Sequence, residues 1–326
     1  MRIGFTTTIP VEIIYAANHV PVDLNNIFML DNSLSLVQQA EYNGFPRNIC
    51  SWIKGLYSVI KNQNIDIIVC VVQGDCSNTH SLMAILKDEA FDVVPFSYPW
   101  NRNREGLSNE ICSLEKYFNV SRAETLSVKK KIDRIRVKLN LIDKLTWQTN
   151  LVTSKENHAW LVSSSDFNSD FVKYELELDS FLSTLNKRKL AEQSIRLGYV
   201  GVPTVFDDLY DFIEDKNARI VFNEVQRQFS MFNIEQDIID QYLNFTYPYD
   251  IFFRIKDIKQ AIKERRIQGL IAYTQSFCHR QLDLLSLKKH IHIPILQIEG
   301  DLPGKIDARI KLRIESFIEL ISSLKK

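Results

Sequence analysis

The sequence predicts an α/β protein with two doubly wound parallel-sheet units and a helical middle segment. Strand-like and helix-like runs alternate with short loops in residues 1–104 and again in residues 195–326. An alternating order of this kind favours parallel sheets with right-handed crossovers. No glycine occurs between Gly106 and Gly198, so residues 105–194 are expected to form a helical linker or cap.

The first unit contains three predicted strands and an early helix. Residues 2–8 form the first strand, and a helix over residues 11–17 follows it, with proline at a favourable early position. Residues 66–72 carry six consecutive apolar side chains, which is typical of a strand buried on both faces of a parallel sheet. Residues 92–98 contain Pro95 and are therefore placed at a sheet edge.

The middle segment and the second unit follow the same logic. Val128, Ile132, Ile135 and Leu139 recur at intervals of three and four residues, as in an amphipathic helix. The second unit is predicted to contain strands at residues 196–202, 218–225, 269–274 and 295–299, with helices at residues 205–215, 257–266, 276–290 and 307–325.

Composition narrows the class of protein. The chain has 326 residues, of which 45% are hydrophobic and 25% charged, as in an ordinary globular protein of about two domains. Forty basic and forty acidic residues cancel, so no broad field favours nucleic acid or anionic lipid. No run approaches a membrane span or a secretion signal, and the cysteine count is odd. We therefore expect a cytoplasmic protein with reduced thiols and with neither nucleic-acid nor membrane partners.

Several common catalytic and nucleotide-binding motifs are absent. The chain contains neither Gly-x-x-x-x-Gly-Lys-Ser/Thr nor Gly-x-Gly-x-x-Gly, which argues against a nucleotide triphosphatase or a standard dinucleotide-binding protein. It also lacks Gly-x-Ser-x-Gly and His-Glu-x-x-His. Candidate chemistry must therefore come from other residues.

Three cysteines are the strongest candidates for chemistry. Cys76 and Cys278 follow predicted strands, and Cys50 begins a helix-like run; loops of this kind can face one crevice in an α/β fold. Three thiolates there would suit an iron–sulfur cluster, which normally takes four, and would leave one iron open. Inert packing of each thiol is the alternative, because the usual C-x-x-C spacing is absent. Cys70 and Cys112 are expected to be buried core residues.

Short motifs along the whole chain resemble those of a known family. They are Pro10-Val-Glu-Ile-Ile-Tyr-Ala-Ala17 with Pro21-Val22, Cys50-Ser-Trp52, Gly74-Asp-Cys76, Gly201-Val-Pro203, Asn223-Glu224, Ser276-Phe-Cys278, Gln297-Ile-Glu-Gly-Asp301 and Arg313-Ile-Glu-Ser-Phe-Ile-Glu319. In this order they resemble the D-component (small-subunit) family of the 2-hydroxyacyl-CoA dehydratases, which also includes benzoyl-CoA reductase subunits.

The resemblance implies two Rossmann-like lobes with a [4Fe–4S] cluster in the cleft, held by Cys50, Cys76 and Cys278. It implies a related dehydratase subunit as partner, in a homodimer or a heterodimer, and a separate ATP-dependent iron–sulfur activator protein that supplies one electron. The implied reaction is elimination of water from a 2-hydroxyacyl-CoA, with acyl-CoA as substrate. A non-catalytic electron-relay subunit, an activator-dependent reductase of another small molecule, and a cluster-free scaffold are the alternatives.

Polar residues beside the cysteines extend the candidate site. Cluster sulfurs require hydrogen-bond donors, and the candidates for this cofactor-binding role are Gln73, Ser77, Gln275 and Ser276. His279, next to Cys278, is a candidate to orient substrate or to tune the cluster.

A second group of candidates lies on the first helix. Glu12, Tyr15 and His19 are spaced by three and four residues, so they lie near one helical face and are acid–base candidates. Capping or core hydrogen bonding is the alternative for these three residues. Arg227 is a candidate for binding a phosphate or carboxylate, with a structural ion pair as its alternative.

Overall fold

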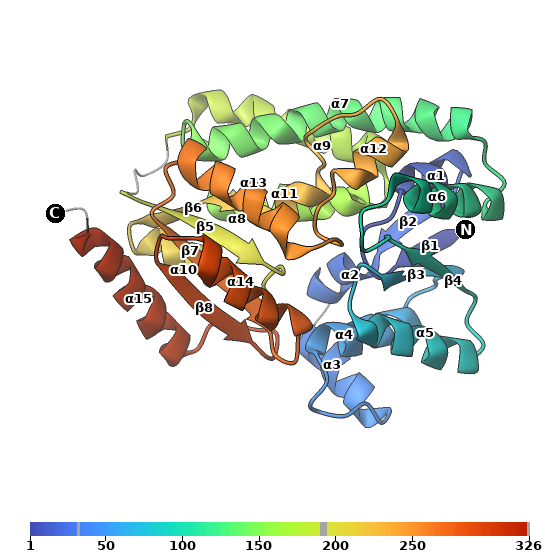
Figure 1. The fold of residues 1–326 in the computed structure, drawn as a ribbon, viewed down its shortest axis with the longest axis horizontal. Helices are drawn as coiled ribbons and strands as arrows, with labels where there is room; N and C mark the ends of the chain where they lie inside the picture. The colour runs from blue at the N-terminus through green and yellow to red at the C-terminus, as the bar shows by residue number, and fades with distance from the viewer. Residues whose placement is uncertain (31–32, 190–193, 325–326) are drawn as a thin grey trace.

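The protein contains two four-stranded, all-parallel sheets, each covered by helices (Figure 1). This computed structural model describes residues 1–30, 33–189 and 194–324. The first sheet has the order β2-β1-β3-β4, with β1 (Arg2–Phe5), β2 (Val20–Asp23), β3 (Ile67–Gln73) and β4 (Val93–Ser97). The second has the order β6-β5-β7-β8, with β5 (Ile195–Gly201), β6 (Ala218–Asn223), β7 (Gly269–Gln275) and β8 (Ile295–Gly300). The predicted α/β class with two Rossmann-like lobes is confirmed.

The strands occupy the places that their sequences favour. β3 lies inside the first sheet, and its first five residues are buried, as its continuous apolar run predicts. β4 lies at the edge, where Pro95 needs no ladder hydrogen bond, and this prediction is confirmed. The other edge strand, β2, was not predicted, because its four residues, Val-Pro-Val-Asp, include a proline and show no long pattern.

The helices of the two lobes flank these sheets. The first lobe contains α1 (Val11–Ala16), α2 (Leu24–Leu30), α3 (Ser33–Tyr42), α4 (Ser51–Asn62) and α5 (Ser77–Asp88). The second contains α10 (Leu209–Asp215), α11 (Glu224–Phe229), α12 (Ile238–Leu243), α13 (Ile251–Glu264), the 3-10 helix η4 (His279–Leu282), α14 (Asp283–His290) and α15 (Ala308–Ser323).

Some predicted boundaries were wrong. α13 begins at Ile251 rather than at residue 257, because the Asp250 side chain accepts a hydrogen bond from the Phe252 N–H and starts the helix earlier. The helix predicted at residues 205–215 begins only at Leu209, and strand β6 gives way to α11 at Glu224. The predicted end of the last helix, Lys325, lies outside the described residues.

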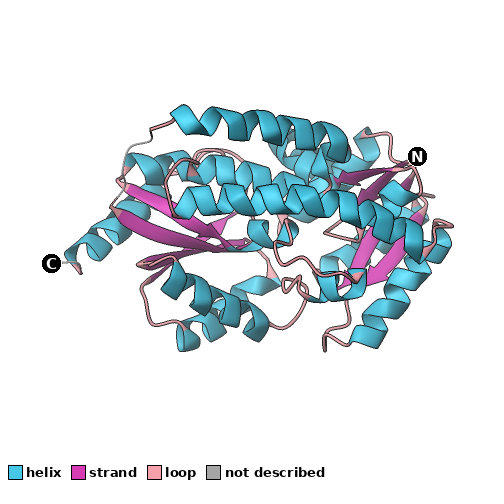
Figure 2. Ribbon diagram, turned by 90° about the horizontal axis from the view of Figure 1, so that it is seen from above, coloured by secondary structure: helices cyan, strands magenta, loops and turns pink. Residues whose placement is uncertain are grey.

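The middle segment is helical, as predicted, and joins the lobes. It comprises α6 (Arg104–Tyr117), α7 (Arg122–Trp147), α8 (Ser154–Val162) and α9 (Phe171–Thr184), with 3-10 turns η1 (Ser163–Ser165), η2 (Phe167–Ser169) and η3 (Leu185–Lys187). A capping box between Ser121 and Glu124 starts α7. α7 packs against α1 of the first lobe and β6 of the second, and Figure 2 shows long helices running from one sheet to the other.

One hydrophobic core continues through both lobes. It includes Ile3 and Phe5 from the first sheet, Ile135 from α7, and Tyr199 and Ile271 from the second sheet, all fully buried. Because this core crosses them, the domain boundaries predicted at residues 104 and 194 do not separate independent cores, and they stay predictions. Among the described residues, no helix has the length and apolar character needed to cross a membrane.

Candidate functional site

The three candidate cysteines occupy equivalent positions at the starts of helices. Cys50 is the N-cap of α4, Cys76 is the N-cap of α5, and Cys278 is the N-cap of η4. Cys76 follows the carboxyl end of β3, and Cys278 follows that of β7. Both strands lie inside their sheets, so these loops occupy the edge at which open α/β sheets bind ligands. We refer to these residues as the cysteine trio.

Electrostatic coupling places the trio in one region. Burial, together with smaller effects of the charges of Cys278 and Cys76, raises the pKa of Cys50 to about 12. Burial likewise raises the pKa of Cys76 to about 11, and it raises that of Cys278. Although Cys50 and Cys278 are separated by more than two hundred residues, the structure brings them near enough for their charges to interact.

A hydrogen-bonded bridge holds two of the cysteine loops together across the lobes. Ser51, next to Cys50, donates to the carbonyl oxygen of Asp301, and the Gln275 amide donates to the same oxygen. The Gln275 Nε2 atom also lies 3.3 Å from Ser51 Oγ, while its Oε1 accepts a hydrogen bond of 3.0 Å from Tyr273. This Ser51–Gln275 bridge fixes the start of α4 against the end of β7.

The third loop packs against the second lobe through Gly74. This residue has φ of +94°, and a Cβ atom there would lie 2.7 Å from Pro248 Cβ and 2.8 Å from Tyr98 Cβ. Only glycine fits both the backbone conformation and the space. The next residue, Asp75, is partly exposed, yet loss of hydration raises the pKa of its carboxyl to about 6, while Thr79 and Arg280 oppose that shift.

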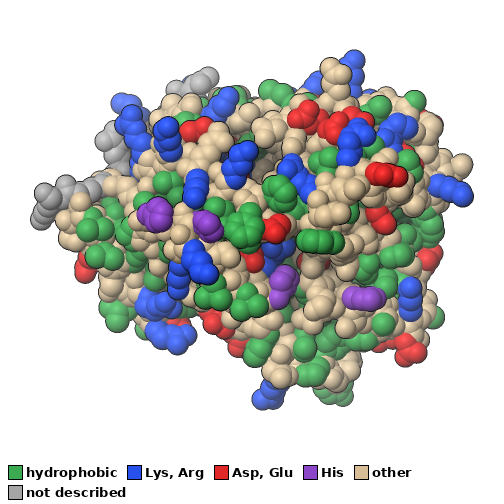
Figure 3. Space-filling view, in the orientation of Figure 1, with side chains coloured by type: hydrophobic (Ala, Val, Ile, Leu, Met, Phe, Trp, Pro, Cys, Tyr) green, Lys and Arg blue, Asp and Glu red, His purple; other side chains and the backbone are tan. Residues whose placement is uncertain are grey.

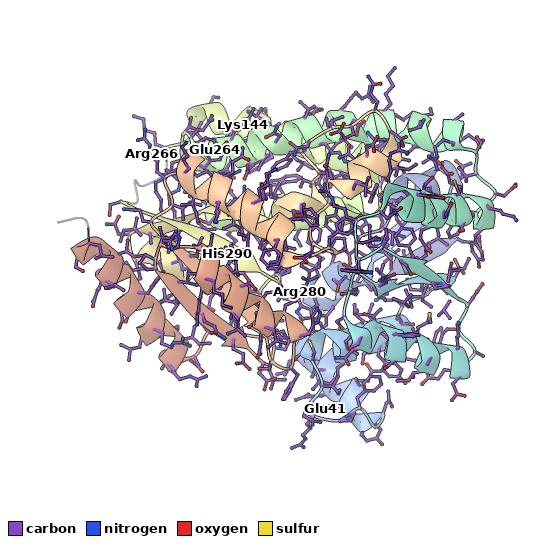
Figure 4. The ribbon with its side chains drawn as sticks, in the orientation of Figure 1. Glu41, Lys144, Glu264, Arg266, Arg280 and His290 are labelled. Carbon is purple, nitrogen blue, oxygen red and sulfur yellow. The ribbon has the colours of Figure 1, made fainter. Side chains whose placement is uncertain are left out.

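Arg280 is the residue of this region that the sequence analysis missed. It donates a 2.9 Å hydrogen bond to the Tyr247 carbonyl oxygen and lies over the Tyr247 ring at 4.0 Å. Its charge acts on Asp75 and on Cys278. Figure 4 places it at the junction between the two lobes. The available signal was its position two residues after Cys278.

Peptide N–H groups add positive potential at the trio. The N–H groups of Trp52 and Ile53 lower the pKa of Cys50, those of Thr79 and Asn78 lower that of Cys76, and that of Arg280 lowers that of Cys278. Helix N-termini favour anions because their first N–H groups lack partners within the helix. These N–H groups therefore stabilise a thiolate, or another anion, at each cysteine. Burial has the larger and opposite effect on the three pKa values.

The four predicted donors lie in the cysteine loops but differ in their surroundings. Gln73 and Ser77 are exposed. Gln275 is buried and takes part in the Ser51–Gln275 bridge, and Ser276 Oγ donates a 2.7 Å hydrogen bond to Glu299. The Gln275 and Ser276 donors thus face oxygen atoms here, and their predicted role toward cluster sulfurs stays a prediction.

The acid–base candidates on the first helix contact other parts of the fold. Glu12 is fully buried, and it forms a 2.7 Å ion pair with Arg136 and accepts a 2.7 Å hydrogen bond from Tyr242. The Tyr15 hydroxyl donates to the Asp166 carbonyl oxygen at 2.6 Å, and burial raises its pKa. These contacts give Glu12 and Tyr15 structural partners in the helical segment and α12.

The two candidate histidines have different settings. The His19 ring packs edge-on against Phe118, with ring centroids 5.9 Å apart. His279 is exposed beside Cys278, yet partial loss of hydration and the charge of Arg280 lower its pKa. Of the four catalytic candidates, His279 is therefore the one that shares a loop with the trio.

The two remaining cysteines, Cys70 and Cys112, differ in their exposure to solvent. Cys70 is fully buried in the first lobe, as predicted. Cys112 is exposed, so its predicted burial was wrong: α6 turns this position outward, where Arg122 contacts the sulfur at 3.5 Å.

Within the described part of the chain, no three His, Cys, Asp or Glu residues are arranged to bind a single metal ion. A cubane differs, since each thiolate binds a separate iron and the ligands are spaced more widely.

One family model matches most of the chain. The family model described as 2-hydroxyglutaryl-CoA dehydratase, D-component, matches residues 6–321, a range that includes the whole trio and every strand of both sheets except β1. A comparison with curated proteins found no match. The chain therefore belongs to the D-component family of 2-hydroxyglutaryl-CoA dehydratase.

Proposed function

We propose that the chain is the iron–sulfur component of a 2-hydroxyacyl-CoA dehydratase-type enzyme, with a [4Fe–4S] cluster held by Cys50, Cys76 and Cys278. Family membership supports a dehydratase-type enzyme component. The observation that supports the cluster assignment is that three thiols from three distant loops each lie at a helix start, and that Cys50 lies within electrostatic range of the other two.

The charges around the trio suit such a ligand. One-electron reduction and an open iron acting as a Lewis acid are the chemistry that the bound cluster would supply. Three thiolates around a reduced cubane leave a net negative charge, which the helix N–H groups and Arg280 are placed to offset. Because burial raises the pKa of all three thiols, loading the metal must release their protons.

The partners follow from the same assignment. The family name describes one component of an enzyme, so we propose a related subunit as partner and an ATP-dependent iron–sulfur activator as electron donor. The substrate class would be a 2-hydroxyacyl-CoA. All five cysteines are free, which supports location in a reducing compartment such as the cytoplasm.

Iron content after anaerobic reconstitution tests the ligands. We expect roughly four irons and four sulfides per chain in the unaltered protein, as for one cubane. Cys278→Ser should lower this content and change the visible spectrum, while Cys112→Ser, at an exposed cysteine outside the trio, should leave both unchanged. Full cluster content in Cys278→Ser would contradict the assignment.

A turnover assay distinguishes catalysis from electron relay. The reduced chain would be mixed with a 2-hydroxyacyl-CoA and an activator, with and without a related subunit. Product formed by this chain alone would rule out the relay alternative. Product formed only after the second subunit is added would assign at least part of the substrate site to that subunit.

A further inference from the structure

A second candidate site lies in a cavity of about 320 Å³ that is lined mainly by residues of the second lobe and does not include Arg280. Residues of α11, α12 and α13 and the loop after β4 line it. Its volume is at the lower end of the range for small-molecule pockets. Figure 3 shows the face of the molecule that carries α13, where Lys and Arg side chains gather along this helix.

Gln228 lines this cavity and carries an unused donor. Its side chain is 7% exposed, and Nε2 has no hydrogen-bond partner among the described residues. The amide cannot be reversed to remove the problem, because Oε1 accepts from the Tyr247 N–H at 2.7 Å and from Thr246 Oγ1 at 3.0 Å. A buried donor without an acceptor is costly, so an acceptor in the cavity would stabilise this arrangement.

The lining carries an excess of positive charge. Arg102, Arg227 and Lys256 line the cavity together with one carboxylate, Asp257. Arg227 is paired with Asp257, yet its Nε, also buried, has no partner among the described residues. Lys256 is exposed and forms no ion pair within the part of the chain that the structure describes. Three cations thus face one carboxylate.

Nearby carboxylates outside the lining do not remove this excess. Glu224 accepts two hydrogen bonds from Arg254, and Asp143 accepts two from Arg265. Each is therefore matched by its own arginine. Glu235 accepts a hydrogen bond of 2.9 Å from Asn244, and Glu264 accepts one of 2.7 Å from Gln260; neither forms an ion pair among the described residues.

We propose that this cavity binds a small organic anion through a carboxylate or phosphate group. The oxyanion would accept hydrogen bonds from Gln228 Nε2 and Arg227 Nε and would pair with Lys256. The apolar wall formed by Met231, Phe232 and Phe253 would contact the organic part. Because none of these residues belongs to the trio, the proposal stands apart from the cluster assignment.

Titration calorimetry with three probes tests the site and separates the two oxyanions. The probes are inorganic phosphate, phenyl phosphate and phenylacetate, each added to the full-length protein. We expect saturable binding of at least one phenyl-bearing probe, and tighter binding of phenyl phosphate than of inorganic phosphate, because only the former reaches the apolar wall. Preference for phenyl phosphate or phenylacetate would identify the oxyanion. Absence of saturable binding by all three overturns the proposal.

Two substitutions on α13 should act in opposite directions. Lys256→Gln should weaken binding at least threefold, whereas Asp257→Asn should strengthen it, because it removes the carboxylate of the lining. Lys259→Gln is the matched control: it removes an exposed lysine of the same helix that does not line the cavity. Equal weakening by Lys259→Gln, or weaker binding in a folded Asp257→Asn protein, would overturn the proposal.

Discussion

Single buried charges hold the helical segment to the first lobe. Glu12 and Arg136 are both nearly inaccessible to solvent, and each has further partners, Tyr242 for the acid and Asp133 for the base. A buried pair of this kind contributes little net stability compared with apolar residues, but removing one partner leaves an uncompensated charge. The stability of the protein is therefore most sensitive to substitutions that remove one partner of a buried ion pair.

Glu12→Gln should lower the free energy of unfolding by about 3 kcal/mol, since Arg136 then keeps only Asp133. Urea denaturation with an unchanged slope would measure this. Glu175→Gln is the control, because its pair with Lys138 is partly exposed and should contribute less than about 1 kcal/mol. Unchanged stability with lost turnover would instead support an acid–base role for Glu12.

His158 should make stability depend on pH. Burial, assisted by the charge of Lys155, lowers its pKa from 6.5 to about 4. Its Nδ1 lies 3.0 Å from the Gln226 amide nitrogen, which is a donor, so the neutral ring suits this site. Because the unfolded chain takes up the proton first, stability is complete above pH 6.5 and falls as the pH drops toward 4, by on the order of 3 kcal/mol.

Unfolding measured across this pH range should show a smaller slope in His158→Gln, which keeps an acceptor for Gln226 but cannot titrate. The comparison between the two proteins is needed because Asp166 opposes the effect: burial and the charge of Asp23 raise its pKa, so its contribution falls as pH rises. Identical slopes in both proteins would show that His158 does not titrate in this way.

Loops at strand ends are the elements that assemble the candidate site. The loop after β3 approaches the second lobe so closely that Gly74 lies against Pro248, while the Ser51–Gln275 bridge joins the start of α4 to the end of β7. The loops after β3 and β7 are short, so their positions are set by the strand and helix that each connects, whereas the Cys50 loop joins α3 to α4. Changes that displace a loop should therefore affect the trio without touching a cysteine.

Gly74→Ala should destabilise the protein by about 2–4 kcal/mol, since the new methyl group meets Pro248 and the positive φ is strained. It should also reduce cluster content, because it displaces Cys76. Gly44→Ala is the control: φ is +99° there, but no atom lies within 4 Å of the added Cβ, so strain of about 1–2 kcal/mol acts alone. Equal losses in both variants would mean that the close approach at Gly74 is not important.

Prediction from sequence succeeded where the signal is local. The apolar run of β3 and the proline of β4 each specify a strand and its place in the sheet. The positions of Arg280 and of the Ser51–Gln275 bridge depend instead on how two lobes dock, and no periodicity in the sequence encodes that docking. The exposure of Cys112 was missed because it depends on which face of α6 packs inward.

At the scale of the whole molecule, the lobes share one core and are not independent. The buried cluster includes side chains of both sheets and of α7. A lobe separated from this core would expose apolar surface that its own helices do not cover, and that exposure costs about 25 cal/mol per Å².

A fragment of residues 1–104 should therefore not unfold cooperatively. Circular dichroism during heating would test this expectation, with the full-length protein under the same conditions as the control. The fragment lacks α7, against which α1 packs in the complete chain. A sharp thermal transition in the fragment, with native-like helix and strand content, would show that the first lobe folds by itself.

The hydrogen bond from Tyr242 to Glu12 joins residues separated by 230 positions. During translation, α1 leaves the ribosome well before α12 has been synthesised, so the contact between Glu12 and Tyr242 cannot form until late. Until then, the face of α1 that is buried in the native protein stays exposed and can bind nascent-chain chaperones. Slower elongation would lengthen this exposure. Synthesis in the cell should accordingly depend on such helpers more than refolding of the finished polypeptide at low concentration does.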